Sequence, residues 1–129
     1  MSLFDLSSKV SIITGGNGGI GYAMAEAVGL AGSSVIIAGR NIDKSKKAVE
    51  NLQSKKINAI SIEVDVSDEE SCNELIVKSK EKFGRIDILI NNAGTNVRKR
   101  PEEYELQEWC SIININLDIL KVLKPFKTF

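Results

Sequence analysis

A glycine-rich run near the amino terminus holds the residues whose types and spacing point most directly to chemistry. The run is Thr14-Gly15-Gly16-Asn17-Gly18-Gly19-Ile20-Gly21, and it follows a short β-branched run, Val10–Thr14. Glycines allow a sharp turn and a close approach of the backbone to a pyrophosphate, while the first amides of a following helix attract the anion. No lysine follows the last glycine, so a Walker-type P-loop is not supported. The run predicts a dinucleotide-binding turn, and a purely structural turn is the alternative.

Arg40 follows the next β-branched run, Val35–Ala38, and is the second candidate. In dinucleotide-binding folds an acidic residue about twenty positions beyond the glycine turn holds the ribose 2′-hydroxyl. Gly39 stands at that place here, and Arg40 and Asn41 come next. Because a guanidinium pairs well with a phosphate, this pattern predicts NADP(H) in preference to NAD(H). A solvated surface arginine is the alternative.

Three further polar motifs follow apolar stretches or lie within one. Asp65-Val66 comes after the run Ala59–Val64, Asn91-Asn92-Ala93-Gly94 comes at the end of another, and Asn116 lies inside an apolar helical stretch. Taken alone, each has a structural explanation. These are an exposed carboxylate at the end of a strand, a turn, and a hydrogen-bonded core asparagine, respectively.

The elements that must position these residues alternate along the chain, which predicts a βαβ pattern with a parallel sheet. The expected strands are Val10–Thr14, Val35–Ala38, Ala59–Val64 and Ile86–Ile90. The first expected helix carries an apolar stripe of Ile20, Met24, Ala27, Val28 and Ala31. The second begins near Asp43, and the third begins with a capping box of Ser67 and Glu70. The last runs from about Leu106 to Leu123. We therefore expect an α/β chain with a Rossmann-type doubly wound sheet, truncated after about four strands.

Composition narrows the possible functions. Seventeen basic residues balance seventeen acidic ones, so we expect neither a nucleic-acid nor a membrane partner. The chain has no histidine, and Cys72 and Cys110 lack metal-ligand spacing, so we expect no metal site and no serine–histidine hydrolysis. The start lacks a signal-peptide pattern, and we expect a cytoplasmic protein.

Four motifs, taken together and in this order, resemble the short-chain dehydrogenase/reductase family. They are the spacing Thr-Gly-x-x-x-Gly-x-Gly, the pair Asp65-Val66, the run Asn91–Gly94 and Asn116. The resemblance implies hydride transfer between a nicotinamide and a small alcohol or carbonyl compound. It implies cofactor contacts from Gly15, Asn17, Gly18, Gly19, Ile20, Gly21, Arg40, Asn41, Asp65, Val66, Asn92, Ala93 and Gly94. Asp65 would hold the adenine amino group, and Asn116 would shape the active site and hold a water of the proton relay.

The sequence departs from the family pattern in its catalytic residues. The family's serine and Tyr-x-x-x-Lys pair are absent, because Tyr104 is followed four residues later by Glu108 and Tyr22 cannot replace it. We therefore expect residues 1–129 to be one incomplete NAD(P)-binding domain, inactive alone, with homo-oligomers only for a complete chain. The alternative is a non-catalytic dinucleotide-binding module that acts through a partner. The loop after Gly94 resembles those of gluconate dehydrogenases, tropinone reductases and oxoacyl reductases, which leaves the substrate open.

Overall fold

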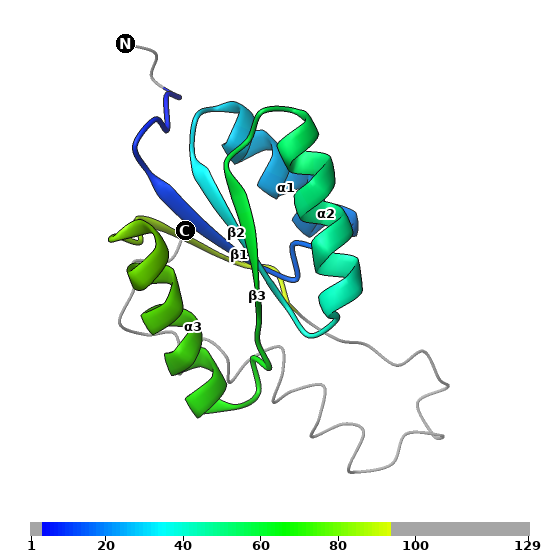
Figure 1. Ribbon diagram of the computed structural model, residues 1–129, viewed down its shortest axis with the longest axis vertical. Coiled ribbons are helices and arrows are strands. Elements are labelled where there is room, and N and C mark those ends of the chain that lie inside the picture. Colours follow the sequence, from blue (N-terminus) through cyan, green and yellow to red (C-terminus); the bar gives the residue numbers. More distant parts are fainter. Residues whose placement is uncertain (1–3, 94–129) are drawn as a thin grey trace, which may run out of the picture.

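The computed structural model describes residues 4–93 (Figure 1). Strands and helices alternate in this range as β1 (Val10–Thr14), α1 (Gly19–Leu30), β2 (Ser34–Gly39), α2 (Ile42–Ser54), β3 (Ala59–Glu63), α3 (Glu69–Phe83) and β4 (Ile88–Asn91). The strands form a parallel sheet in the order β3-β2-β1-β4. This confirms the predicted Rossmann-type fold with a parallel sheet. The predicted helix from Leu106 to Leu123 and the far end of the predicted domain lie outside the described residues.

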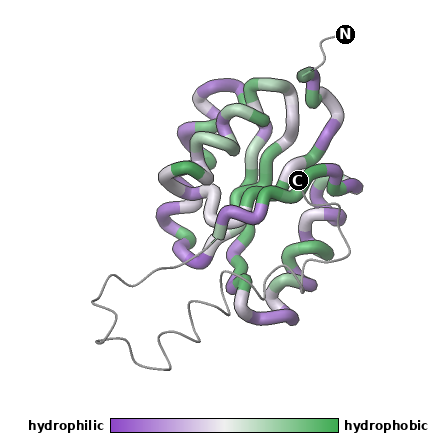
Figure 2. Tube along the Cα trace, turned by 180° about the vertical axis from the view of Figure 1, so that it is seen from behind, coloured by the Kyte–Doolittle hydropathy of each residue, from purple (hydrophilic) through white to green (hydrophobic). Residues whose placement is uncertain are grey.

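The sheet is covered on both faces, with α1 and α2 on one side and α3 on the other (Figure 1). Successive strand residues point to opposite faces, so neighbours enter different cores. Ile12 packs in the cluster that contains Leu75 of α3, whereas Ile13 packs in the cluster that contains Ala25 of α1 and Leu52 of α2. Burial on both faces explains the unbroken apolar run Val35–Ala38 in β2. Figure 2 shows the hydrophobic strands inside and hydrophilic segments along the outer helices.

The buried face of α1 is not the predicted apolar stripe. Ile20 is 76% exposed and Ala27 is exposed, whereas Gly21, Ala25 and Gly29 are buried. A Cβ atom on Gly29 would lie only 2.6 Å from Cγ2 of Ile57. The helix therefore packs on its neighbours through its smallest residues, a face that the spacing of large apolar residues does not reveal.

The start of α3 also differs from the prediction of a capping box formed by Ser67 and Glu70. The N-cap is Asp68, whose side chain accepts a hydrogen bond from the Glu70 amide at 3.2 Å. The Ser67 amide and hydroxyl instead donate to Oδ1 of Asp65, at 3.0 and 2.6 Å. Short polar side chains bond readily to nearby turns, so Ser67 belongs to the turn before the helix.

Cys72 of α3 is fully buried. Burial, reinforced by the charge of Asp68, raises the pKa of its thiol to about 11. The thiol therefore stays protonated near neutral pH and serves as a core residue. None of the helices formed by residues 4–93 is long and apolar enough to span a membrane.

Strand β4 begins two residues later than predicted, and Asp87, just before it, bonds to the start of β1 through both its backbone and its side chain. The Asp87 amide donates to the Val10 carbonyl oxygen at 2.9 Å, and Oδ2 of Asp87 accepts from the Val10 amide at 2.9 Å. Arg85 donates to both carboxylate oxygens, at 2.8 and 2.6 Å. The Arg85 guanidinium, assisted by the Val10 amide, lowers the pKa of Asp87.

We predict that Asp87→Ala lowers the free energy of unfolding by about 1 kcal/mol near neutral pH, because the buried Val10 amide loses its acceptor. The lowered pKa means that the carboxylate stabilises the fold above the ordinary aspartate pKa of about 4. This contribution disappears as the pH falls through the folded-state pKa. Urea unfolding at several pH values measures it, with Glu81→Ala on the exposed face of α3 as control. If the wild type and Asp87→Ala differed in free energy of unfolding by the same amount at low pH as at neutral pH, the prediction would be wrong.

Candidate functional site

A hollow of about 450 Å³ lies at the carboxyl ends of the strands and collects most of the predicted cofactor residues. This is the edge at which open α/β sheets bind ligands. The hollow is lined by Gly15, Asn17, Gly18, Ala38, Gly39, Arg40, Asn41, Lys44, Val64, Asp65, Val66, Asn92 and Ala93.

Three of the predicted residues that the structure describes do not line this hollow. Gly19, Ile20 and Gly21 belong to the first turn of α1, where Ile20 is exposed and Gly21 is buried. Gly94 and Asn116 lie outside the described residues. In the other direction, Lys44 lines the hollow although the sequence did not single it out. The sequence feature that could have indicated Lys44 is its position four residues after Arg40, in the helix that follows β2.

Two glycines shape the turn in different ways. A Cβ atom on Gly21 would collide with the carbonyl oxygen of Gly15 and with Nδ2 of Asn92, so this glycine allows close packing of helix on strand. Gly19 has φ of +56°, which favours glycine, but a Cβ atom there would meet nothing within 4 Å. Gly21 is therefore enclosed by the protein, whereas Gly19 faces open space. An enclosed and an open glycine in one turn fit a backbone that approaches a bound pyrophosphate closely.

The amino end of α1 is uncapped, unlike the other helices of the described chain. Its N-cap Gly18 makes no side-chain cap bond, and its first turn holds no acidic residue. By contrast, Oδ1 of Asn41 caps α2 by accepting from the Lys44 amide at 3.0 Å, and Asp68 caps α3. Free amides and the positive end of the helix dipole favour an anion at the start of α1.

Thr14 fastens the end of β4 to the glycine turn. Its buried hydroxyl accepts hydrogen bonds from the Asn92 amide at 3.1 Å and from the Ala93 amide at 3.0 Å. Nδ2 of Asn92 then donates to the Gly15 carbonyl oxygen at 3.2 Å. These three bonds place the Asn92-Ala93 segment beside the turn, where it closes one wall of the hollow.

On the other side, Asn17 fastens the turn to α2. Its Nδ2 donates to the hydroxyl of Ser45 at 3.2 Å, and Ser45 is buried in the first turns of the helix. A Cβ atom on Gly39 would lie 2.7 Å from the same Nδ2 atom. The end of β2 therefore leaves room for the Asn17 amide, and the glycine turn is held from both sides.

Two cations and one carboxylate line the hollow, namely Arg40, Lys44 and Asp65. The ion pairs among residues 4–93 join Lys55 to Glu26 and Arg85 to Asp87, which leaves Arg40 and Lys44 without a carboxylate partner in this part of the chain. The pKa of Asp65 is lowered, first by the Ser67 hydroxyl and amide and further by the charge of Arg40. Asp65 is therefore ionised near neutral pH and can accept hydrogen bonds at the wall of the hollow.

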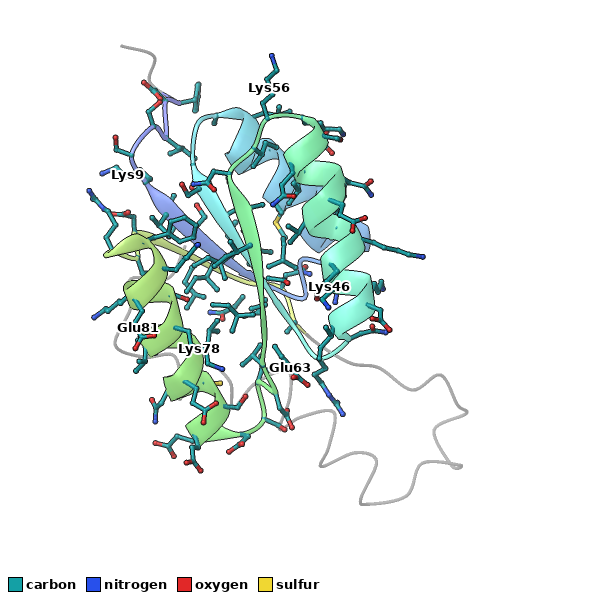
Figure 3. All side chains as sticks on the ribbon, in the orientation of Figure 1. Lys9, Lys46, Lys56, Glu63, Lys78 and Glu81 are labelled. Carbon is teal, nitrogen blue, oxygen red and sulfur yellow. The ribbon has the colours of Figure 1, made fainter. Side chains whose placement is uncertain are left out.

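A second hollow of about 640 Å³ adjoins the first and shares Arg40, Asn41, Val64 and Asp65 with it. Its outer wall includes Glu63 at the end of β3 and Lys78 on α3, both labelled in Figure 3. The two hollows form an extended depression across the ends of β1, β2 and β3. This shape suits an elongated ligand better than a compact one.

Comparisons with known proteins agree with this geometry. Residues 9–120 match the family described as short chain dehydrogenase. An uncharacterized oxidoreductase of Staphylococcus saprophyticus is 34% identical over 116 residues, or 89% of this chain and 50% of the relative. An uncharacterized oxidoreductase of Staphylococcus aureus is 34% identical over 112 residues, or 87% of this chain and 48% of the relative. The chain spans about half the length of the curated relatives it matches.

Solved structures show the same fold. A protein assigned as a gluconate dehydrogenase from Agrobacterium tumefaciens superposes with a TM-score of 0.90 at 30% identity, covering 97% of this chain and 49% of that one. One assigned as a short-chain alcohol dehydrogenase from Sinorhizobium meliloti superposes with a TM-score of 0.89 at 27% identity, covering 96% and 49% of the two chains.

We predict that Thr14→Val lowers the free energy of unfolding by about 2 kcal/mol, because the Asn92 and Ala93 amides lose their shared acceptor. Thr14→Ser keeps the hydroxyl and is the matched control. Urea unfolding of the three proteins gives the comparison. Equal stability of the valine and serine variants would show that the hydroxyl does not hold the end of β4.

Proposed function

The chain belongs to the short-chain dehydrogenase family, and on that premise we propose that it binds NADP(H) for hydride transfer between the nicotinamide and a small alcohol or carbonyl compound. Family membership implies a nicotinamide dinucleotide, and the preference for the phosphorylated form is the finer part of the proposal. The observation that carries it is the end of β2, where Gly39 replaces an acid and Arg40 has no carboxylate partner among the described residues.

Different residues around the hollow would contact different parts of such a cofactor. The uncapped start of α1 supports the pyrophosphate, with Gly19 on its open side. Arg40 supports the 2′-phosphate, and Asp65 with Val66 supports the adenine on the wall that they form. Asn92 and Ala93 line the opposite wall, toward which we place the nicotinamide half. When bound, the cofactor supplies or accepts the hydride.

Hydride addition to a carbonyl carbon develops negative charge on the oxygen, which requires a proton donor. Neither tyrosine of the 129 residues is followed four positions later by lysine, since Glu26 and Glu108 stand there. We therefore propose that these residues form the cofactor-binding part of the reaction centre, to which Asn116 belongs as a positioning residue. A small alcohol or carbonyl substrate and a cytoplasmic location are parts of the same proposal.

We predict that the chain binds NADP(H) more tightly than NAD(H), and that Arg40→Ala removes most of this difference. A charge-assisted bond to phosphate contributes about 1.5–3 kcal/mol, so the NADP(H) affinity falls roughly tenfold or more. Calorimetric titration with both cofactors measures this, and NAD(H) serves as the internal control. Equal wild-type affinities, or an unchanged NADP(H) affinity in the variant, would refute the preference.

We also predict that the 129-residue chain consumes no NADPH above background with ketones, sugars or oxoacyl thioesters. General acid–base assistance typically contributes about two to four orders of magnitude in rate, and the sequence provides no Tyr-x-x-x-Lys pair to supply it. Absorbance of NADPH follows the reaction. Steady turnover that Asn116→Ala abolishes would mean that the chain uses a different acid.

A further inference from the structure

We propose that Lys44 is a second cation of the 2′-phosphate site and that, together with Arg40, it sets the selectivity for NADP(H). This inference rests on the proposed function and deepens it by assigning a specificity role to a residue outside the glycine turn. Lys44 stands in the first turn of α2, four residues after Arg40. Both side chains border the same hollow.

The first argument is the place of the Lys44 ammonium group. A Cβ atom built on Gly18 would lie 2.9 Å from both Cε and Nζ of Lys44. The end of the lysine side chain therefore occupies the space that a side chain at position 18 would take. The side chain reaches back from α2 to the glycine turn, although no carboxylate among residues 4–93 pairs with it there.

The second argument is that the backbone on both sides of this contact is fixed. Asn41 caps the first turn of α2 by accepting from the Lys44 amide, and Asn17 is bonded to Ser45. Residues 17 and 18 of the turn thus face residues 44 and 45 of the helix. A lysine so placed keeps its ammonium near the turn while its flexible stem can follow a ligand.

The third argument concerns which phosphate Lys44 meets. The amides of α1 already provide for the pyrophosphate, whereas Lys44 belongs to the helix that directly follows β2 and the Gly39-Arg40 corner. A phosphate monoester carries between one and two negative charges near neutral pH, so a single arginine leaves part of its charge uncompensated. The point charge of a lysine complements the planar fork of the arginine. The two cations together match a 2′-phosphate.

A substitution at Gly18 tests the same contact independently of Lys44. Its φ of −172° and ψ of 168° are extended backbone, which any residue adopts. The turn itself therefore does not require glycine at this position. Gly18→Ala would meet only the flexible end of Lys44, so it moves the ammonium group away without straining the turn.

The test titrates the full 129-residue chain with adenosine 2′,5′-bisphosphate and with 5′-AMP, which differ only in the 2′-phosphate. We expect Lys44→Gln to weaken binding of the bisphosphate about tenfold, to leave 5′-AMP binding unchanged and to reduce the salt dependence of bisphosphate binding. Gly18→Ala should weaken bisphosphate binding in the same direction. Lys46→Gln is the matched control, because Lys46 stands on the same helix (Figure 3) but does not border the hollow. Circular dichroism melts establish that each variant is folded.

The possible outcomes separate this inference from the proposed function. If wild type prefers the bisphosphate and Arg40→Ala removes the preference while Lys44→Gln does not, the NADP(H) proposal stands and the role of Lys44 is refuted. Equal weakening of both ligands by Lys44→Gln would assign Lys44 to the 5′-phosphate and also overturn the inference. If wild type shows no preference, the proposed NADP(H) selectivity itself fails. Unchanged binding in a folded Gly18→Ala variant would contradict the placement of the ammonium group.

Discussion

The close approach of α1 to the end of β1 governs the arrangement of the whole site. At Gly21 the helix lies so near the Gly15 carbonyl and the Asn92 side chain that no Cβ atom fits between them. This contact directs the first amides of α1 toward the ends of the strands. It also leaves the Gly15 carbonyl within reach of Asn92, and so joins the glycine turn to β4.

Hydrogen bonds to neighbouring elements hold the glycine turn in place. The Gly15 amide donates to the Ala38 carbonyl oxygen of β2, the Thr14 hydroxyl accepts from the segment after β4, and Asn17 reaches α2. Each bond joins the turn to a different element. A turn fixed in this way presents amides that are already oriented, which reduces the ordering that an anion must impose when it binds.

The sequence predicted those parts of the molecule that depend on local pattern. The run Val10–Thr14 forms β1 with the predicted bounds, and the residues after each strand end meet at one edge because the strands are parallel. What it missed depends on distances between elements. The reach of Lys44 to Gly18 follows from the packing of α2 beside the turn, and the choice of Asp68 over Ser67 as N-cap follows from a competing turn at Asp65. Neither of these two features produces a periodic pattern of residue types in the sequence.

The face that α1 turns toward its neighbours inverts the usual relation between residue size and tolerance to mutation. Leu30 is a large apolar residue on this helix, yet it is 64% exposed, and a polar replacement would disturb no core contact. Gly29, beside it, has the smallest side chain possible, and one added methyl group would have to displace Ile57. A scan of substitutions along α1 would therefore find its strictest positions among its smallest residues, repeating every fourth residue from Gly21 through Ala25 to Gly29.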